Sequence, residues 1–296
     1  MMRKISFLLG MVLMATIFFA TEIRFNEESK IVFNSDMNGQ DDIYLLTKNQ
    51  LVQLTDDPGT DRYPVANQAG DQIVFASNRS GNFNIYLMNL QTRAVKELTS
   101  DERNEESPSW SADQQFIYYD LEISGGKWQI MKLELKSGKK TPLFVDPPFK
   151  SMIVVFQNNR GDEFFFTGKV FLGWLVAKYN LKSRKYTEMA SRGSCRPRIS
   201  PDSSQVAFVN DEDDGLGDVF LMNSDGSNKT NLTKLNSNYY DYYPCFSPDG
   251  SKIVFSSSPK EKKKTAYQLY VIDLQSKKIR LIFRSNGKNS YPCWFR

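Results

Sequence analysis

The segment PCFSPDGSKIVF, from Pro244 to Phe255, places a compact turn between two short apolar stretches. Its centre, Ser247-Pro248-Asp249-Gly250, combines the residues that most favour chain reversal. The proline at position 244 suits the start of a strand, where no ladder N–H group is needed. This stretch therefore predicts a strand, a tight turn and a second strand.

The apolar stretch that follows the turn recurs along the chain. Each copy closes on an aromatic residue, and these aromatics are separated by 42, 43, 48, 42 and 47 residues: Phe33, Phe75, Tyr118, Phe166, Phe208 and Phe255. A period of about 40–50 residues is typical of the four-stranded blade of a β-propeller. The spacing therefore indicates six repeats of one structural unit.

Three further strands complete each repeat. The one before the apolar stretch is expected at residues 63–65, 107–110, 151–156, 196–199, 243–246 and 291–294. The one after it is expected at residues 43–45, 85–87, 130–131, 175–176, 219–221 and 269–271. The last is expected to centre on Leu54, Leu98, Leu143, Met189, Leu232 and Ile282. We therefore predict an all-β fold, a six-bladed β-propeller of four-stranded blades.

The two ends of the chain share one blade in this scheme. The apolar strand at residues 31–33 lacks an inner partner, and the last segment, residues 291–295, is an inner strand without the other three. Pairing the N- and C-terminal strands closes the ring and leaves few free strand edges. Residues 22–25 are an alternative inner strand, but Pro292-Cys293-Trp294 matches Pro244-Cys245-Phe246 better.

The segment at residues 244–255 resembles the TolB-type β-propeller repeat, and Leu54-Thr55, Leu98-Thr99 and Leu232-Thr233 supply its later Leu-Thr element. The resemblance covers about residues 22–296. It implies a propeller that docks envelope proteins. TolB itself also carries an N-terminal α/β domain, for which we expect no room in this chain.

The first twenty residues differ from the rest. Arg3 and Lys4 precede an uncharged apolar run over residues 5–20, as in a secretory signal peptide. An uncleaved N-terminal anchor is the alternative, and a buried N-terminal helix is the remaining one. We expect residues 1–20 to be the signal peptide or anchor and residues 21–296 to be the propeller, exported to the periplasm or secreted, with membrane contact only through an uncleaved N-terminal segment.

Composition excludes several classes of function. The chain has no histidine, which removes the commonest general base and transition-metal ligand. With 38 Lys and Arg against 34 Asp and Glu, it gives no electrostatic reason to expect nucleic acid. We therefore predict no catalytic residue, no cofactor and a non-enzymatic role. The alternative is a carbohydrate-active or other propeller enzyme, lyase-like, that uses carboxylates, Lys or Arg.

The strongest candidate site is one mouth of the central channel. The loops that lead into the inner strands are expected to bring there Arg62, Tyr63, Glu106, Arg196, Tyr243 and Tyr291. Arg and Tyr are enriched in binding hot spots. These residues predict a docking surface for an envelope protein or peptide on a monomeric propeller. The alternative is that the tyrosines cap blade junctions and the charges are solvated.

Other polar clusters carry weaker signals. Asp211, Asp213 and Asp214 are weak calcium candidates, but their spacing does not fit an EF-hand and favours a solvated acidic turn. The basic run at residues 260–264 could contact an anionic surface, although an extended, solvated hairpin tip is the preferred interpretation.

The three cysteines are too few for a disulfide framework. Cys245 and Cys293 share one repeat position on neighbouring blades and are expected as two buried thiols, with a bridge as the alternative. Cys195 has no partner in register.

Overall fold

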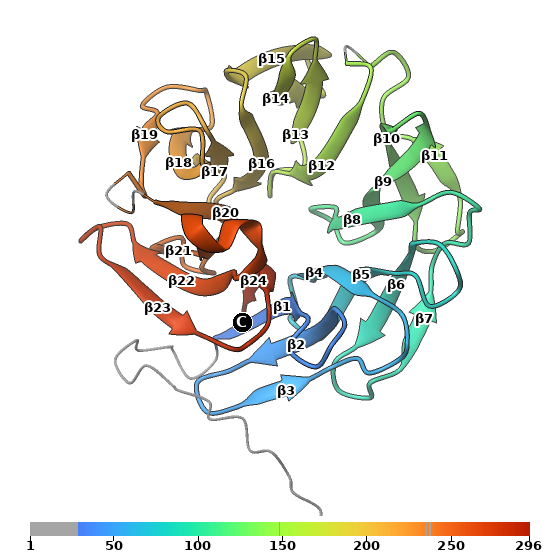
Figure 1. Ribbon diagram of the computed structural model, residues 1–296. Helices are drawn as coiled ribbons and strands as arrows, with labels where there is room; N and C mark the ends of the chain where they lie inside the picture. The colour runs from blue at the N-terminus through green and yellow to red at the C-terminus, as the bar shows by residue number, and fades with distance from the viewer. Residues whose placement is uncertain (1–28, 148, 235, 237) are drawn as a thin grey trace, which may run out of the picture.

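The structure, a computed structural model, describes residues 29–147, 149–234, 236 and 238–296. Six separate four-stranded sheets stand around a central axis and form a ring (Figure 1). This confirms the predicted six-bladed β-propeller. The expected signal peptide or anchor at residues 1–20 and the competing strand at 22–25 lie outside the described residues.

Each blade is an antiparallel sheet whose strands follow one another from the channel outward. The first three blades contain β24 (Asn289–Phe295), β1 (Lys30–Ser35), β2 (Asp42–Leu46) and β3 (Leu51–Gln53); β4 (Asp61–Ala66), β5 (Gln72–Ser77), β6 (Asn84–Asn89) and β7 (Val95–Glu97); and β8 (Glu105–Trp110), β9 (Phe116–Ser124), β10 (Lys127–Glu134) and β11 (Lys140–Pro142).

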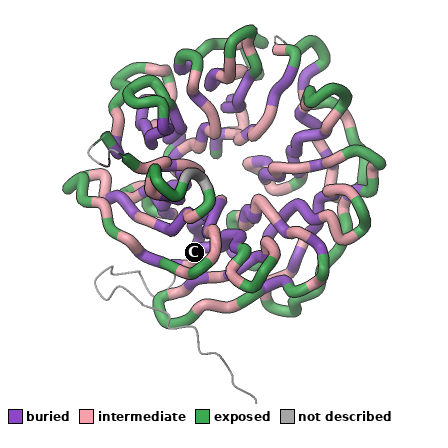
Figure 2. Tube along the Cα trace, viewed as in Figure 1, coloured by how far each residue is buried: buried purple, intermediate pink, exposed green. Residues whose placement is uncertain are grey.

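The other three blades repeat this order. They contain β12 (Met152–Gln157), β13 (Glu163–Val170), β14 (Gly173–Asn180) and β15 (Lys185–Ala190); β16 (Ser194–Ile199), β17 (Gln205–Asn210), β18 (Asp218–Asn223) and β19 (Thr230–Asn231); and β20 (Tyr239–Phe246), β21 (Lys252–Pro259), β22 (Gln268–Asp273) and β23 (Ile279–Phe283). Buried residues follow the strands, and exposed residues gather on the connecting loops (Figure 2).

The ring closes as predicted. The last strand, β24, is the inner strand of the blade that begins with β1, and Cys293 lies opposite Val32 in the antiparallel ladder. Trp294 pairs with Ile31 in the same ladder. The first and last described strands are therefore held together by backbone hydrogen bonds rather than by a covalent link.

Side-chain hydrogen bonds explain the Ser-Pro-Asp-Gly turn. The Ser247 hydroxyl donates to Asp249 Oδ1 at 2.6 Å and accepts from the Lys252 N–H group at 2.9 Å. Gly250, at φ +72°, takes the left-handed conformation that glycine adopts without strain. Burial raises the pKa of Asp249, but hydrogen bonds from Ser247 and Ser251 outweigh it and lower the pKa to about 2. The motif is thus a self-contained turn.

The Leu-Thr element directly follows the outer strand in three blades. The hydroxyl oxygens of Thr55, Thr99 and Thr233 accept hydrogen bonds from the N–H group of the second residue of β2, β6 and β18, at 2.9, 2.8 and 3.0 Å. The strands β3, β7 and β19 stop before their leucines, so the expectation that they centre on Leu54, Leu98 and Leu232 is wrong by a few residues. The threonine leaves the sheet to bond the strand beside it.

The register of the third blade also differs from the prediction. Ser109 pairs with Tyr118, whereas the corresponding Val65 in the second blade pairs with Val74. Tyr119, fully buried, therefore occupies the position of Phe75, and the expected alignment of Tyr118 is wrong by one residue. A shift of one residue exchanges the two faces of a strand, and two adjacent tyrosines conceal it in the sequence.

The basic run lies in the short 3₁₀ helix η1 (Lys260–Thr265), which follows β21 and contacts β20 (Figure 1). It lies in the connection of the β21–β22 hairpin, and Lys260, Glu261 and Lys262 are exposed, as the preferred interpretation expected. The sequence did not indicate that this tip would be helical. No helix among the described residues is long and apolar enough to span a membrane.

Candidate functional site: a tyrosine–arginine cluster in the channel

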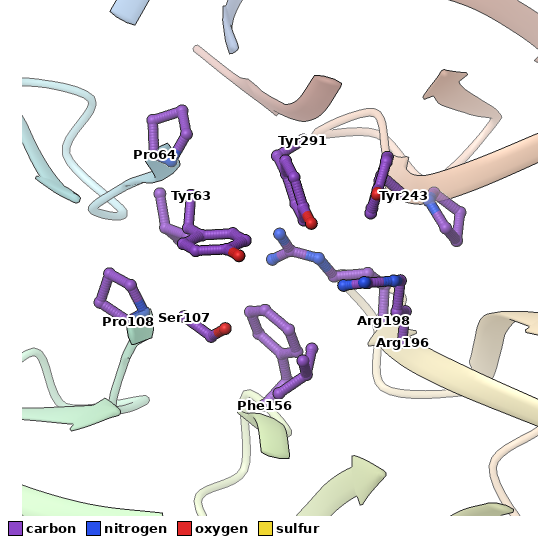
Figure 3. A pocket seen from close by; sticks show the side chains of 12 residues that line it. Tyr63, Pro64, Ser107, Pro108, Phe156, Arg196, Arg198, Tyr243 and Tyr291 are labelled. Carbon is purple, nitrogen blue, oxygen red and sulfur yellow. The ribbon is translucent and has the colours of Figure 1, made fainter. Parts of the chain in front are cut away.

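Every inner strand carries a β-bulge at the same place. One residue of each inner strand has φ between 51° and 60°: Tyr63, Ser107, Val154, Arg196, Tyr243 and Tyr291. Proline follows this residue in all blades except the fourth, where Val155 does. Proline lacks an N–H group and so suits an unpaired bulge position. All six residues line the channel. Figure 3 shows five of their side chains turned toward it, those of Tyr63, Ser107, Arg196, Tyr243 and Tyr291.

Four of these side chains pack against one another. The rings of Tyr243 and Tyr291 have centroids 3.8 Å apart, and the ring of Tyr63 meets Tyr291 edge-on at 4.4 Å. The Arg196 guanidinium lies 4.5 Å from the centroid of Tyr243 and 5.3 Å from that of Tyr291. We call Tyr63, Arg196, Tyr243 and Tyr291 the channel cluster. Contacts of this kind are individually favourable cation–π and aromatic pairs.

The channel cluster is uncharged apart from its arginine. Burial raises the pKa values of Tyr63, Tyr243 and Tyr291 far above neutrality, so all three phenols stay protonated. Burial opposes the charged form of Arg196, but its interactions with Tyr291 and Tyr243 outweigh this and raise its pKa. The cluster therefore presents one permanent positive charge, surrounded by aromatic rings.

Side chains of the preceding blade bond two of the bulge N–H groups. Both carboxylate oxygens of Asp120 accept from the Val154 N–H group at 3.0 Å, and Thr167 Oγ1 accepts from the Arg196 N–H group at 2.9 Å. Burial raises the pKa of Asp120 well above its usual value. These bonds hold Val154 and Arg196 in the left-handed conformation. That conformation is unfavourable for a β-branched residue such as Val154.

Arg62 and Glu106 lie beside the channel cluster. Arg62 Nε donates to Asp41 Oδ2 at 2.9 Å, its guanidinium lies 5.5 Å from the Phe83 ring centroid, and its side chain is 39% exposed. Burial raises the pKa of Glu106, while hydrogen bonding with Tyr63 and the charge of Arg62 oppose the shift. The structure thus groups all six predicted residues, with Arg62 on the outer side.

The expectation that these side chains project from loops is wrong. All six residues lie within inner strands, and the bulge turns four of them, those of the channel cluster, toward the axis. The hollow that the channel cluster borders has a volume of about 30 Å³, enough for about two water molecules. A partner would therefore meet the cluster at its outer surface rather than thread through the channel.

The two faces of the ring differ. We call the face with the loops that lead into the inner strands the leading face and the opposite one the trailing face. On the trailing face the channel widens into a funnel of about 490 Å³ that Arg198, Cys245 and Cys293 help to line. Ser247 and Pro248 of the Ser-Pro-Asp-Gly turn, and Ser200 and Pro201 of the related turn in the preceding blade, contribute to its wall. The larger hollow is thus opposite the predicted docking mouth.

Exposed apolar side chains on the leading face were not anticipated from the sequence. Phe171 is 97% exposed and Leu172 66% exposed in the β13–β14 connection, and Val145 before β12 is 90% exposed. The signal was present in the sequence, because Phe171 and Leu172 interrupt a hairpin where polar turn residues are usual. Adjacent exposed apolar residues of this kind mark interaction sites.

The acidic candidates do not form a set of ligands. Asp213 accepts from Asn231 Nδ2 at 2.7 Å, and Asp214 accepts from the Leu216 N–H group at 2.9 Å. Within the described residues no three His, Cys, Asp or Glu side chains are arranged to hold a metal ion. The loop that contains Asp211 is therefore ordered by its own hydrogen bonds.

The closed ring of six blades, with its channel cluster on the axis, defines the protein as a β-propeller. Its ring is closed by hydrogen bonds between β1 and β24. The family model described as the TolB beta propeller domain matches residues 24–146 and 63–241. The chain belongs to this family.

Individual relatives agree with this assignment. The chain is 25% identical over 239 residues, 75% of its length, to the Tol-Pal system protein TolB of Francisella tularensis, and it spans 53% of that protein. It thus covers about half the length of the curated relatives that it matches. The crystal structure of TolB from Acinetobacter baumannii superposes with a TM-score of 0.78 at 17% identity, covering 93% of this chain and 68% of that one.

A solved enzyme shares the architecture at a lower level. Oligogalacturonate lyase from Vibrio parahaemolyticus is similar with a TM-score of 0.54 at 17% identity, over 85% of this chain and 73% of that one. At these identities a structural likeness establishes the fold alone.

Proposed function

We propose that this chain is an exported, non-catalytic β-propeller that binds a protein or peptide partner in the cell envelope. The partner docks on the leading face, over the channel cluster, Arg62 and Glu106. The observation that carries the proposal is the convergence of Arg196 with three tyrosines from different blades at the start of the inner strands. Family membership supports an envelope scaffold and the exported location.

The chemistry of the leading face favours a partner segment with both acidic and apolar side chains. Arg62 offers a partly exposed guanidinium next to the aromatic rings of the cluster. Phe171, Leu172 and Val145 offer apolar area on the same face. Arginine and aromatic anchors with a surrounding apolar rim are the composition of binding hot spots.

A binding assay with surface variants tests the proposal. The full chain serves as bait for cross-linked envelope proteins, and the captured partner is then purified and titrated. Arg62→Ala should weaken the binding of the partner by about 1–2 kcal/mol. The double change Phe171→Ser with Leu172→Ser should weaken it by a similar amount. Lys96→Ala, an exposed change on the outer strand β7, is the matched control and should have no effect. Equal affinity for all variants would place the partner elsewhere.

The lyase-like alternative is tested directly. Arg196, Arg198 and Glu106 near the channel are the side chains that such an enzyme would use. Turnover of oligogalacturonides by the purified chain, abolished by Arg198→Ala, would establish the alternative. We expect no turnover.

A further inference from the structure

Cys245 and Cys293 occupy one repeat position in two neighbouring inner strands, β20 and β24. Each lies two residues after a tyrosine of the channel cluster. Their exposed fractions are only 8% and 6%, and both are free thiols in the structure. The pair is therefore a buried couple of nucleophilic groups that the proposed function does not use.

The two cysteines lie close together across the gap between blades, and both line the same hollow. The backbone N–H group of Trp294, the residue after Cys293, donates a hydrogen bond to the sulfur of Cys245 at 3.4 Å. The neighbouring Cys293 thiol foremost, together with the charge of Arg198 and the Trp294 N–H group, outweighs burial and lowers the pKa of Cys245. A thiolate beside a second thiol is the arrangement found at reactive dithiols.

The pair also has a route to solvent. Both cysteines help to line the funnel of about 490 Å³ on the trailing face, next to Arg198. Small disulfides can reach the sulfurs through this funnel, and the guanidinium favours approach of an anionic one.

A covalent bond at this position would change how the ring is closed. The strands β20 and β24 belong to different sheets, and β24 is held to β1 by backbone hydrogen bonds. A link between the cysteines would tie the closing strand to the preceding blade as well. Unfolding that begins with detachment of β24 would then be blocked.

We propose that Cys245 and Cys293 are a thiol–disulfide site whose oxidation locks the propeller ring. The Cys245 thiolate attacks a low-molecular-weight disulfide, forming a mixed disulfide and releasing one thiolate. Cys293 loses its proton to solvent and attacks the Cys245 sulfur, which forms the internal S–S bond and releases the second thiolate. Two protein thiols are oxidised and one external disulfide is reduced to two thiols. The site is independent of the proposed partner binding.

Equilibration of the full chain in glutathione buffers of graded redox potential tests this proposal. Free thiols are alkylated, and peptides are mapped by mass spectrometry without reductant. We expect a peptide that links Cys245 to Cys293, with Cys195 alkylated throughout. The oxidised protein should unfold several degrees higher than the reduced protein, because the link restricts the unfolded chain.

Three results would overturn the proposal. These are complete alkylation of both cysteines in the most oxidising buffer, a bridge that involves Cys195, and an equal thermal midpoint for the two redox forms. The comparison of redox forms needs no substitution, so it holds even if a variant fails to fold. Cys195→Ser is the matched control and should keep the full shift, whereas Cys293→Ser should abolish it.

Discussion

The ring of Tyr63 stands edge-on to the ring of Tyr291, with centroids 4.4 Å apart and planes at 80°. Tyr63 belongs to β4 near the beginning of the described chain, and Tyr291 belongs to its last strand. Their contact exists only because β24 returns to pair with β1. The channel cluster therefore forms only when the ring is closed, and loss of either should affect the other.

The first prediction concerns closure. Deletion of residues 290–296 removes the inner strand of the first blade and exposes the inner edge of β1. We expect a lower thermal midpoint and self-association, because an unpaired strand edge is a template for pairing with another chain. Calorimetry and size-exclusion chromatography measure both effects. Arg296→Ala, at an exposed terminal residue, should change neither. A monomeric truncated protein with the original midpoint would refute this closure.

The second prediction compares what Tyr291 and Arg62 contribute to the free energy of unfolding. Tyr291→Ala should lower the free energy of unfolding by about 3–5 kcal/mol, because it leaves a void among Tyr63, Tyr243 and Arg196. Arg62→Ala should cost less than about 1 kcal/mol, since its ion pair with Asp41 is partly exposed. Urea unfolding measures both, and Tyr291→Phe should retain most of the stability. Similar losses for Tyr291→Ala and Arg62→Ala would contradict this arrangement.

The third prediction concerns pH. Burial raises the pKa of Asp241 to about 7, although hydrogen bonds from Ser257 and Asn236 oppose the shift. The folded protein therefore holds this proton more tightly than the unfolded chain, whose Asp has a pKa near 3.9. The contribution to stability is complete below pH ~4 and is lost as the pH rises through about 7. The chain has no histidine to mask this trend.

Replacing the carboxyl should flatten the pH profile. Asp241→Asn should reduce the change in the free energy of unfolding between pH 4 and pH 8 by about 2–4 kcal/mol, at roughly 1.4 kcal/mol for each pKa unit. Asn289 shows that an amide is accommodated at the same position of another inner strand. Asp249→Asn, at a carboxyl with a pKa of about 2, is the control and should leave this pH range unchanged. Profiles of equal slope for wild type and Asp241→Asn would rule out the raised pKa.

The fourth prediction concerns the Leu-Thr element. Thr233→Val keeps the shape of the side chain but removes the acceptor for the Val219 N–H group and the donor to Asp218 Oδ1. We expect a loss of about 1–3 kcal/mol, because a buried N–H group and a buried carboxylate both lose a partner. Thr233→Ser retains the hydroxyl and should lose less than Thr233→Val. Chemical denaturation that ranks valine at or above serine would contradict this role.

Much of the fold was predictable because it depends on local signals. The period of the apolar strands gave the number of blades, and the match of Pro292-Cys293-Trp294 to Pro244-Cys245-Phe246 gave the closure. The register of the third blade was not predictable in this way. Tyr118 and Tyr119 are adjacent residues of the same type, so the sequence pattern fits either of them at this position. Only packing decides which one is fully buried.

The candidate site was predictable in composition but not in geometry. Arg196, Tyr243 and Tyr291 recur before proline, and that recurrence identified them. Their position inside strands depends on a left-handed bulge, which no residue type at that position reveals, since Tyr, Ser, Val and Arg all adopt it. The proximity of Cys245 and Cys293 likewise depends on the spacing of blades that share no hydrogen-bonded ladder.

The sequence by itself determined the all-β class, the six blades, the closure by the chain ends and the chemistry of the turns. Each of these follows from periodicity or from hydrogen bonds within a few residues, which the order of amino acids specifies directly. Tertiary structure alone decided that four side chains from different blades meet on the axis and that the larger hollow opens on the opposite face. These features arise from the angle between neighbouring sheets and from the bulge of each inner strand, which act over distances that no local pattern encodes.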